Sequence, residues 1–220
     1  MKLVLASGSQ RRRELLTMCG YDYEIIVSNA DETIDESDPE SFVRALSFRK
    51  AKDVFDRLFA AGRRDFAVIG SDTVVAFQKE GEAKPVIIGK PKDAKDAVRI
   101  LSMLSGKTHR VFTGVSVIAD IPDENAAAQC SIREKAEIQT ECSITEVTFE
   151  TLSPDEITDY VNSGDPLDKA GSYGIQGPFG MFVREIRGNY FTVIGMPIPV
   201  LYKMLKKIGI LPHGFYERIE

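Results

Sequence analysis

The stretch from Leu3 to Leu16 constrains the fold more than any other part of the chain, because it joins a strand, a tight turn and a helix directly. Leu3 to Ala6 is a short apolar run typical of a buried strand, and Ser7-Gly8-Ser9 has the composition of a tight turn. The residues from Arg11 to Cys19 are predicted to form the helix. Ser9 is placed to cap it, because its hydroxyl can accept a hydrogen bond from a first-turn amide.

Three arginines occupy the first turn of this helix, Arg11, Arg12 and Arg13. The helix dipole disfavours cations at this end. A bound anion would reverse that penalty, because free amides, the hydroxyls of Ser7 and Ser9 and at least one guanidinium would converge on it. Successive residues are about 100° apart around a helix, so at most two arginines can face one ligand and the third is expected to be a solvated surface charge. A basic helix start without any ligand is the alternative.

Composition limits the classes of function. The chain has 220 residues, of which 43% are hydrophobic and 28% charged, which suits one large domain or one with an inserted lobe. A net charge of −5 argues against a general binder of nucleic acid or membrane surfaces. Three cysteines without CxxC spacing and two histidines make a Cys/His zinc site improbable and favour reduced thiols in the cytoplasm. No apolar run is long enough for a signal peptide or a membrane span.

The longest predicted helix begins at Asp38 and Pro39, with Asp38 as the N-cap. Lys50 falls on the apolar stripe of this helix. A lysine there either extends its ammonium to the surface or reaches across a cleft to an anion. The acidic loop from Asp31 to Asp38, which precedes the helix, is either solvated surface or, beside a phosphate site, a place for a divalent cation.

A buried strand is predicted from Phe66 to Ala76, and Asp72 lies in the middle of it. A carboxylate in such a strand is costly unless it is hydrogen-bonded, bound to a metal or open to a cleft. A structural aspartate satisfied by backbone amides is therefore one interpretation of Asp72, and a functional carboxylate is the other.

The remainder of the chain alternates predicted strands and helices and contains one glycine-rich loop, from Asp165 to Gly177, in which Asp168, Lys169 and Gln176 are interleaved. The segment from Asp120 to Cys142 is polar and is expected to be an exposed hairpin extension, in which Cys130 and Cys142 could face each other. The other predicted elements are a strand at Tyr23–Ser28, a turn at Glu80–Pro85 with a returning strand at Val86–Ile88, a helix at Asp93–Leu104, strands at Val111–Ala119 and Thr145–Phe149, a capping box at Ser153–Glu156, a hairpin of Met181–Ile186 with Tyr190–Ile194, and a helix at Pro199–Ile208.

Five motifs occur in order along the chain, and together they resemble the Maf family of nucleoside triphosphate pyrophosphatases. They are Leu-Ala-Ser-Gly-Ser-x-Arg-Arg-x-Glu-Leu-Leu from Leu5, Gly-x-Asp-Thr from Gly70, Lys-Pro at Lys90, Leu-Ser-Gly-x-x-His-x-Val-x-Thr-Gly from Leu104, and Asp-Lys-Ala-Gly-x-Tyr-Gly-Ile-Gln-Gly from Asp168. Gln10 stands where the family has proline, which alters the helix start and leaves the anion-binding argument intact.

The resemblance implies an α/β fold with a long mixed twisted sheet flanked by helices and two lobes around a nucleotide cleft, similar to the inosine triphosphate pyrophosphatases. It implies a single Maf-like domain over residues 1–220, with the extension at about 120–142. It further implies hydrolysis of a nucleoside triphosphate to the monophosphate and pyrophosphate with Mg²⁺ or Mn²⁺, in a protein that could be a homodimer. The residues resemble the branch that acts on dTTP and UTP, with modified pyrimidine nucleotides as equally suitable substrates.

The resemblance also assigns roles to particular residues. Asp72 matches the general base, and Arg11, Thr73 and Gln176 match the positions that set base preference. Glu32, Lys50 and Lys90 match positions around the triphosphate, and Glu32 and Asp72 are the expected metal ligands. The remaining expected substrate-binding residues are Ser7, Ser9, Arg12, Asp168 and Lys169.

Two other classes of function stay open from the sequence. One is a nucleotide-binding regulator of cell division or growth that does not hydrolyse its ligand. The other is a phosphotransferase, which would need a different phosphate cradle because the Gly-x-x-x-x-Gly-Lys-[Ser/Thr] motif is absent.

Overall fold

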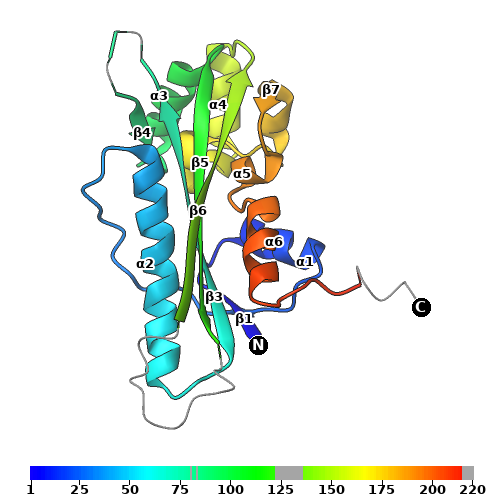
Figure 1. The fold of residues 1–220 in the computed structure, drawn as a ribbon. Coiled ribbons are helices and arrows are strands. Elements are labelled where there is room, and N and C mark those ends of the chain that lie inside the picture. Colours follow the sequence, from blue (N-terminus) through cyan, green and yellow to red (C-terminus); the bar gives the residue numbers. More distant parts are fainter. Residues whose placement is uncertain (80, 83, 122–135, 215–220) are drawn as a thin grey trace.

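The computed structural model describes residues 1–79, 81–82, 84–121 and 136–214, which form one mixed sheet with helices on both faces (Figure 1). The elements are β1 (Lys2–Leu5), α1 (Gln10–Met18), β2 (Glu24–Ile25), α2 (Pro39–Ala60), β3 (Phe66–Phe77), β4 (Val86–Ile88), α3 (Ala94–Leu104), β5 (Thr108–Asp120), β6 (Ala136–Phe149), α4 (Pro154–Asn162), the 3-10 turns η2 (Asp165–Asp168), η3 (Ala170–Ser172) and η4 (Pro178–Phe182), β7 (Val183–Arg187), α5 (Tyr190–Ile194) and α6 (Ile198–Lys207).

The seven-stranded sheet has the order β2-β1-β3-β5-β6-β7, and β4 pairs with the far end of β3. β1 is parallel to β2 and β3, while β3 is antiparallel to β4 and β5, and β6 is antiparallel to β5 and β7. The β5–β6 pair runs without interruption from Thr108 opposite Thr148 to Asp120 opposite Ala136. The predicted long mixed sheet flanked by helices is confirmed.

One edge of β3 is left open in the middle of the strand. β1 pairs with Phe66–Ile69 and β4 pairs with Val75–Phe77. Among the strands of the described chain, none pairs with the intervening residues 70–74 on that edge. Asp72 lies in the middle of this unpaired stretch of β3, and its side chain is largely buried.

Helix α2 covers one face of the sheet at unusually short range (Figure 1). A Cβ atom on Gly70 would lie 2.1 Å from the carbonyl oxygen of Ser47, and one on Gly114 would lie 2.2 Å from that of Val43. Glycine is therefore required at both sheet positions, because any side chain would collide with the helix backbone. The close approach brings the side chains of α2 within reach of β3.

The other face of the sheet carries two separate groups of helices (Figure 1). α1 and α6 pack with β1 and one half of β3 and β5, around a core that includes Leu5, Leu16 and Leu201. α3 and α4 pack over the opposite half, around Leu101 and Phe149. Within the described residues, no helix combines the length and apolar composition needed to span a membrane.

The predicted helix starts are mostly confirmed. Asp38 caps α2 by accepting a hydrogen bond from the Ser41 amide at 2.8 Å, and Ser153 and Glu156 form a reciprocal capping box at α4. Ser9 is at the N-cap of α1, but its hydroxyl makes no cap hydrogen bond; its amide instead donates to Ser7 Oγ at 3.2 Å.

Some predicted elements differ from the structure. The strand predicted at Tyr23–Ser28 is limited to Glu24–Ile25. The hairpin predicted from Met181–Ile186 and Tyr190–Ile194 is wrong, because the second segment is helix α5. Asn189 explains this, since its side chain caps the helix by accepting from the Phe191 amide at 2.8 Å.

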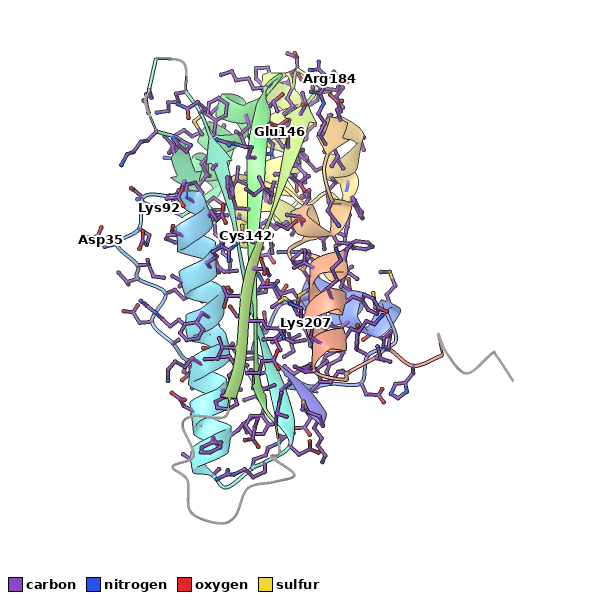
Figure 2. The ribbon with its side chains drawn as sticks, viewed as in Figure 1. Asp35, Lys92, Cys142, Glu146, Arg184 and Lys207 are labelled. Atoms are coloured by element: carbon purple, nitrogen blue, oxygen red, sulfur yellow. The ribbon has the colours of Figure 1, made fainter. Side chains whose placement is uncertain are left out.

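Part of the Asp120–Cys142 segment belongs to the sheet. Residues 136–142 form the first half of β6 and pair with β5, and Figure 2 labels Cys142 midway along this strand. Cys19 and Cys142 are free thiols, and burial raises the pKa of Cys142 to about 12. The suggested approach of Cys130 to Cys142, the tip of the extension and part of the Glu80–Pro85 turn lie outside the described residues.

His109 of β5 is buried in an aromatic cluster. Its ring packs edge-on against Phe149 and Tyr173, and its Nε2 lies 3.0 Å from the Tyr173 hydroxyl. Its Nδ1 is buried without a hydrogen-bond partner. Desolvation lowers the pKa of His109 to about 3, so the ring is neutral in the folded protein at physiological pH.

We expect this histidine to make the fold sensitive to acid. In the unfolded chain its pKa is about 6.5, so below that pH the unfolded state binds one more proton than the folded state. Stability then falls as the pH falls, by up to about 1.4 kcal/mol per pH unit down to the folded pKa. Urea unfolding of the wild type and of His109→Gln at a series of pH values measures this. The variant should lose less stability between neutral pH and about pH 5, and an identical pH dependence in both proteins would contradict the assignment.

Candidate active site

A single cleft of about 780 Å³ lies where the edge of β3 is open. It is bordered by all twelve residues that the sequence singled out, which are Ser7, Ser9, Arg11, Arg12, Glu32, Lys50, Asp72, Thr73, Lys90, Asp168, Lys169 and Gln176. A second hollow of about 480 Å³, beside β2 and the end of the described chain, contains none of them. The structure therefore brings together side chains from widely separated parts of the chain.

Asp72, Lys50 and Glu32 form the charged centre of the cleft. Lys50 Nζ lies 2.8 Å from Asp72 Oδ1 and 2.9 Å from Glu32 Oε1, so one ammonium bridges two carboxylates. The side chains of Lys50 and Asp72 are each only 11% exposed, and that of Glu32 is 66% exposed. Lys50 thus reaches across from α2 instead of extending to the surface, and its pairing explains how Asp72 is tolerated in a buried strand.

Arg12 enters the cleft from the start of α1 and is held on three sides. Its Nε donates to the Gly195 carbonyl at 2.8 Å, its Nη1 to Ser7 Oγ at 3.0 Å, and its Nη2 to Thr73 Oγ1 at 3.4 Å. Desolvation lowers the pKa of Arg12, and the nearby Asp72 carboxylate opposes that shift. A guanidinium has five N–H groups, so two remain for an anion in the cleft.

The other two arginines of α1 differ in environment. Arg11 Nη1 lies 3.6 Å from Asp168 Oδ2, across the cleft. Arg13 also borders the cleft, is half-buried and has a buried Nε atom. All three arginines therefore border the cleft, and each is half-buried, so none of them is a fully exposed surface charge.

Lys169 stabilises the glycine-rich loop from within. Its Nζ donates to the Asp165 carbonyl at 2.5 Å, to Asp165 Oδ1 at 3.1 Å and to Asp168 Oδ1 at 2.7 Å, which uses all three of its N–H groups. The Tyr160 hydroxyl donates to Asp165 Oδ2 and accepts from the Gly174 amide, and burial raises the pKa of Tyr160. Gln176 follows this network and is exposed at the rim of the cleft, as is Lys90 after β4.

The sequence reasoning missed the Gly195 carbonyl, which anchors Arg12, and Ser71, whose hydroxyl bonds that carbonyl. The Gly195 carbonyl accepts from Arg12 and lies 3.0 Å from Ser71 Oγ, which also lies 2.9 Å from the Gly114 carbonyl. Gly195 ends α5 with φ of +112°, a backbone conformation that favours glycine. A glycine at this position could have indicated the end of a helix, but the incorrect strand prediction for Tyr190–Ile194 concealed it.

The carboxylates of the cleft are suitable ligands for a divalent cation that also binds the substrate. No group of three or more His, Cys, Asp or Glu side chains with metal-binding geometry occurs in the described part of the chain. Glu32 and Asp72, however, contact the same ammonium and so present two carboxylates in one place. Mg²⁺ is commonly held by one or two carboxylates together with substrate phosphates, so this pair fits the expected group.

Comparison with solved structures places the fold in a known class. The structure of the Ham1 protein of Staphylococcus aureus is similar with a TM-score of 0.51, over 94% of this chain and 99% of that chain. The two sequences are 14% identical, so the similarity concerns the fold alone.

Comparison with known sequences identifies the family. The family model described as Maf-like protein matches residues 2–208, and the chain belongs to the Maf family. A dTTP/UTP pyrophosphatase of Bacillus thuringiensis subsp. konkukian (strain 97-27) is 43% identical over 210 residues, covering 95% of this chain and 96% of that protein. A dTTP/UTP pyrophosphatase of Agathobacter rectalis is 40% identical over 217 residues, covering 95% and 98% respectively.

Proposed function

We propose that this protein hydrolyses dTTP and UTP, or modified pyrimidine triphosphates, to the nucleoside monophosphate and pyrophosphate with the help of a divalent metal ion. The observation that carries the proposal is the joint position of the Lys50–Asp72 pair and the Arg12 guanidinium in one cleft. The names of the relatives that span nearly the whole chain support the substrate class.

In this proposal Asp72 is the general base. Its carboxylate removes a proton from water as the water oxygen attacks a phosphorus atom of the α–β bridge. The P–O bond between that phosphorus and the bridging oxygen breaks, which separates the nucleoside monophosphate from pyrophosphate. Lys50 fixes the Asp72 carboxylate through the 2.8 Å contact, which restricts the directions in which the base can face.

The positive side chains hold the phosphates. Arg12 is already oriented by Gly195, Ser7 and Thr73, so its two remaining N–H groups can bind phosphate oxygens without reorganising. Glu32 and Asp72 would hold Mg²⁺ or Mn²⁺, which when bound supplies positive charge to the phosphate oxygens. Lys90 lies at the rim as a further candidate for phosphate contact.

Base preference is assigned to Arg11, Thr73 and Gln176. A glutamine can pair with the imide edge of a pyrimidine, because it can donate to a carbonyl and accept from the ring N–H. The position of Gln176 at the rim leaves its amide accessible. We also propose a single domain, a cytoplasmic location and a homodimeric state, on the basis of the family resemblance.

An endpoint assay tests this function. Purified protein with Mg²⁺ is incubated with dTTP, UTP, CTP, GTP and 7-methyl-GTP, and the products are separated by chromatography. We expect monophosphate and pyrophosphate from dTTP and UTP in preference to the others. Nucleoside diphosphate as product would favour a phosphotransferase, and binding without any turnover would favour a regulator.

A further inference from the structure

The position of Glu32 depends on a segment without regular structure. No helix or strand lies between the end of β2 at Ile25 and the start of α2 at Pro39. Strand pairing therefore cannot fix Glu32, although its carboxylate lies 2.9 Å from Lys50. Figure 2 shows the later part of this segment beside α2, with Asp35 on the side away from the helix. Some other interaction must hold the segment in place.

Three residues of α2 provide that interaction. They are spaced four residues apart, so they lie along one side of the helix: Arg49, Asp53 and Arg57. Arg57 Nη2 donates to the Val27 carbonyl at 2.8 Å. Asp53 Oδ2 accepts from Ser28 Oγ, from the Asn29 amide and from Arg57.

Arg49 holds the part of the segment that carries Glu32. Its Nη1 lies 2.8 Å from the Asp31 carbonyl and 2.8 Å from the Thr33 carbonyl, so one guanidinium nitrogen contacts the backbone on both sides of Glu32. The Thr33 amide also donates to Asp31 Oδ1 at 2.9 Å, which tightens the turn. Because Arg49 precedes Lys50 on α2, the segment is fixed to the same helix turn that carries the partner of Glu32.

We propose that Arg49 is a positioning residue for Glu32, and that through Glu32 it determines how well the cleft binds the divalent cation of the proposed reaction. The inference rests on the proposed function for its effect on activity. Its structural part, that Arg49 orders the backbone around Glu32, is independent of the reaction. Residues that orient metal ligands commonly change metal affinity or activity by 10-fold to 100-fold when they are replaced.

The main test replaces Arg49 with glutamine. We expect the Mg²⁺ concentration for half-maximal dTTP hydrolysis to rise about tenfold, with a smaller change in KM for dTTP when Mg²⁺ is saturating. Arg49→Lys should recover part of the loss, because an ammonium can still donate to one of the carbonyls. The matched control is Lys52→Gln, which removes one positive charge from the same helix at a side chain that pairs with Asp56. The control should keep the wild-type Mg²⁺ dependence.

A double variant shows whether Arg49 acts through Glu32. If it does, Arg49→Gln should change the Mg²⁺ dependence far less in a Glu32→Gln protein than in the wild type. Equal effects in both backgrounds would overturn the proposal, because they would mean that Arg49 influences the cleft independently of Glu32.

Hydrogen exchange provides a measurement that does not require activity. In the ligand-free protein, amides at residues 30–34 should exchange faster in Arg49→Gln than in the wild type and in Lys52→Gln. Unchanged exchange, or faster exchange with an unchanged Mg²⁺ dependence in an active enzyme, would overturn the proposal. A wild type that hydrolyses none of the triphosphates would contradict the proposed function instead, and the exchange result would still decide whether Arg49 orders this segment.

Discussion

Asp72→Asn is expected to lower the turnover of dTTP by about two to four orders of magnitude while the protein remains folded. Asparagine keeps the shape of the side chain and an oxygen that can accept from Lys50, whose Nζ lies 2.8 Å from Asp72 Oδ1. It cannot take the proton of the attacking water. Pyrophosphate release at saturating dTTP and Mg²⁺ measures the effect, and thermal unfolding establishes that the variant is folded.

The control for this variant is Asp155→Asn, which makes the same chemical change at an exposed residue in the first turn of α4. It should retain wild-type turnover. If Asp72→Asn also retained near-wild-type turnover, Asp72 would not be the general base, and the charged centre of the cleft would serve binding alone.

Gly114→Ala is expected to destabilise the protein by about 3 kcal/mol, which lowers the thermal midpoint by about 6–12 °C in a protein of this size. The new Cβ would lie 2.2 Å from the Val43 carbonyl oxygen and 3.0 Å from the Arg44 amide nitrogen. Both atoms belong to the backbone of α2, so relief requires the whole helix to move away from the sheet. That movement would also separate Lys50 from Asp72, and we expect turnover to fall with stability.

Gly89→Ala is the matched control for stability. Its added Cβ would meet no atom within 4 Å, and its backbone does not have a positive φ. A change within about 0.5 kcal/mol is expected there. A Gly114→Ala protein that unfolds at the wild-type temperature would show that α2 can shift at little cost, contrary to the packing described above.

Much of the candidate site could be predicted from residues whose positions cost free energy unless another group compensates their charge. Arginines at a helix start, a lysine on an apolar stripe and an aspartate in a buried strand each carry an energetic cost. The structure places Arg12, Lys50 and Asp72 around one cleft, where their charges compensate one another. These positions could be identified from the sequence because the energetic cost of each charge follows from its own helix or strand. It can be recognised without knowing which residue pairs with it.

Other features depend on contacts between distant residues and could not be read from the sequence. The requirement for Gly70 and Gly114 arises from the backbone of α2, which passes within 2.1 and 2.2 Å of their missing Cβ atoms. The three hydrogen bonds that Lys169 donates to Asp165 and Asp168 form only when the loop is folded. The helical state of Tyr190–Ile194 was mispredicted because a short aromatic and β-branched run fits a strand equally well, and only the Asn189 cap distinguishes the two.

The uninterrupted course of β3 and β5 beneath the open edge has a mechanical consequence. Both sides of the cleft are attached to the same pair of strands, which remain hydrogen-bonded to each other from Ala67 opposite Ala119 to Ala76 opposite Arg110. A hinge between the two sides would have to break the hydrogen bonds between β3 and β5. The part of the sheet that carries Asp72 is therefore expected to stay rigid. Under the proposed function, we expect adjustment to the nucleotide to be confined to the segments at the rim, including the turn after β1 and the glycine-rich loop. We therefore expect substitutions at the rim to change which base is accepted, while Asp72 keeps its position.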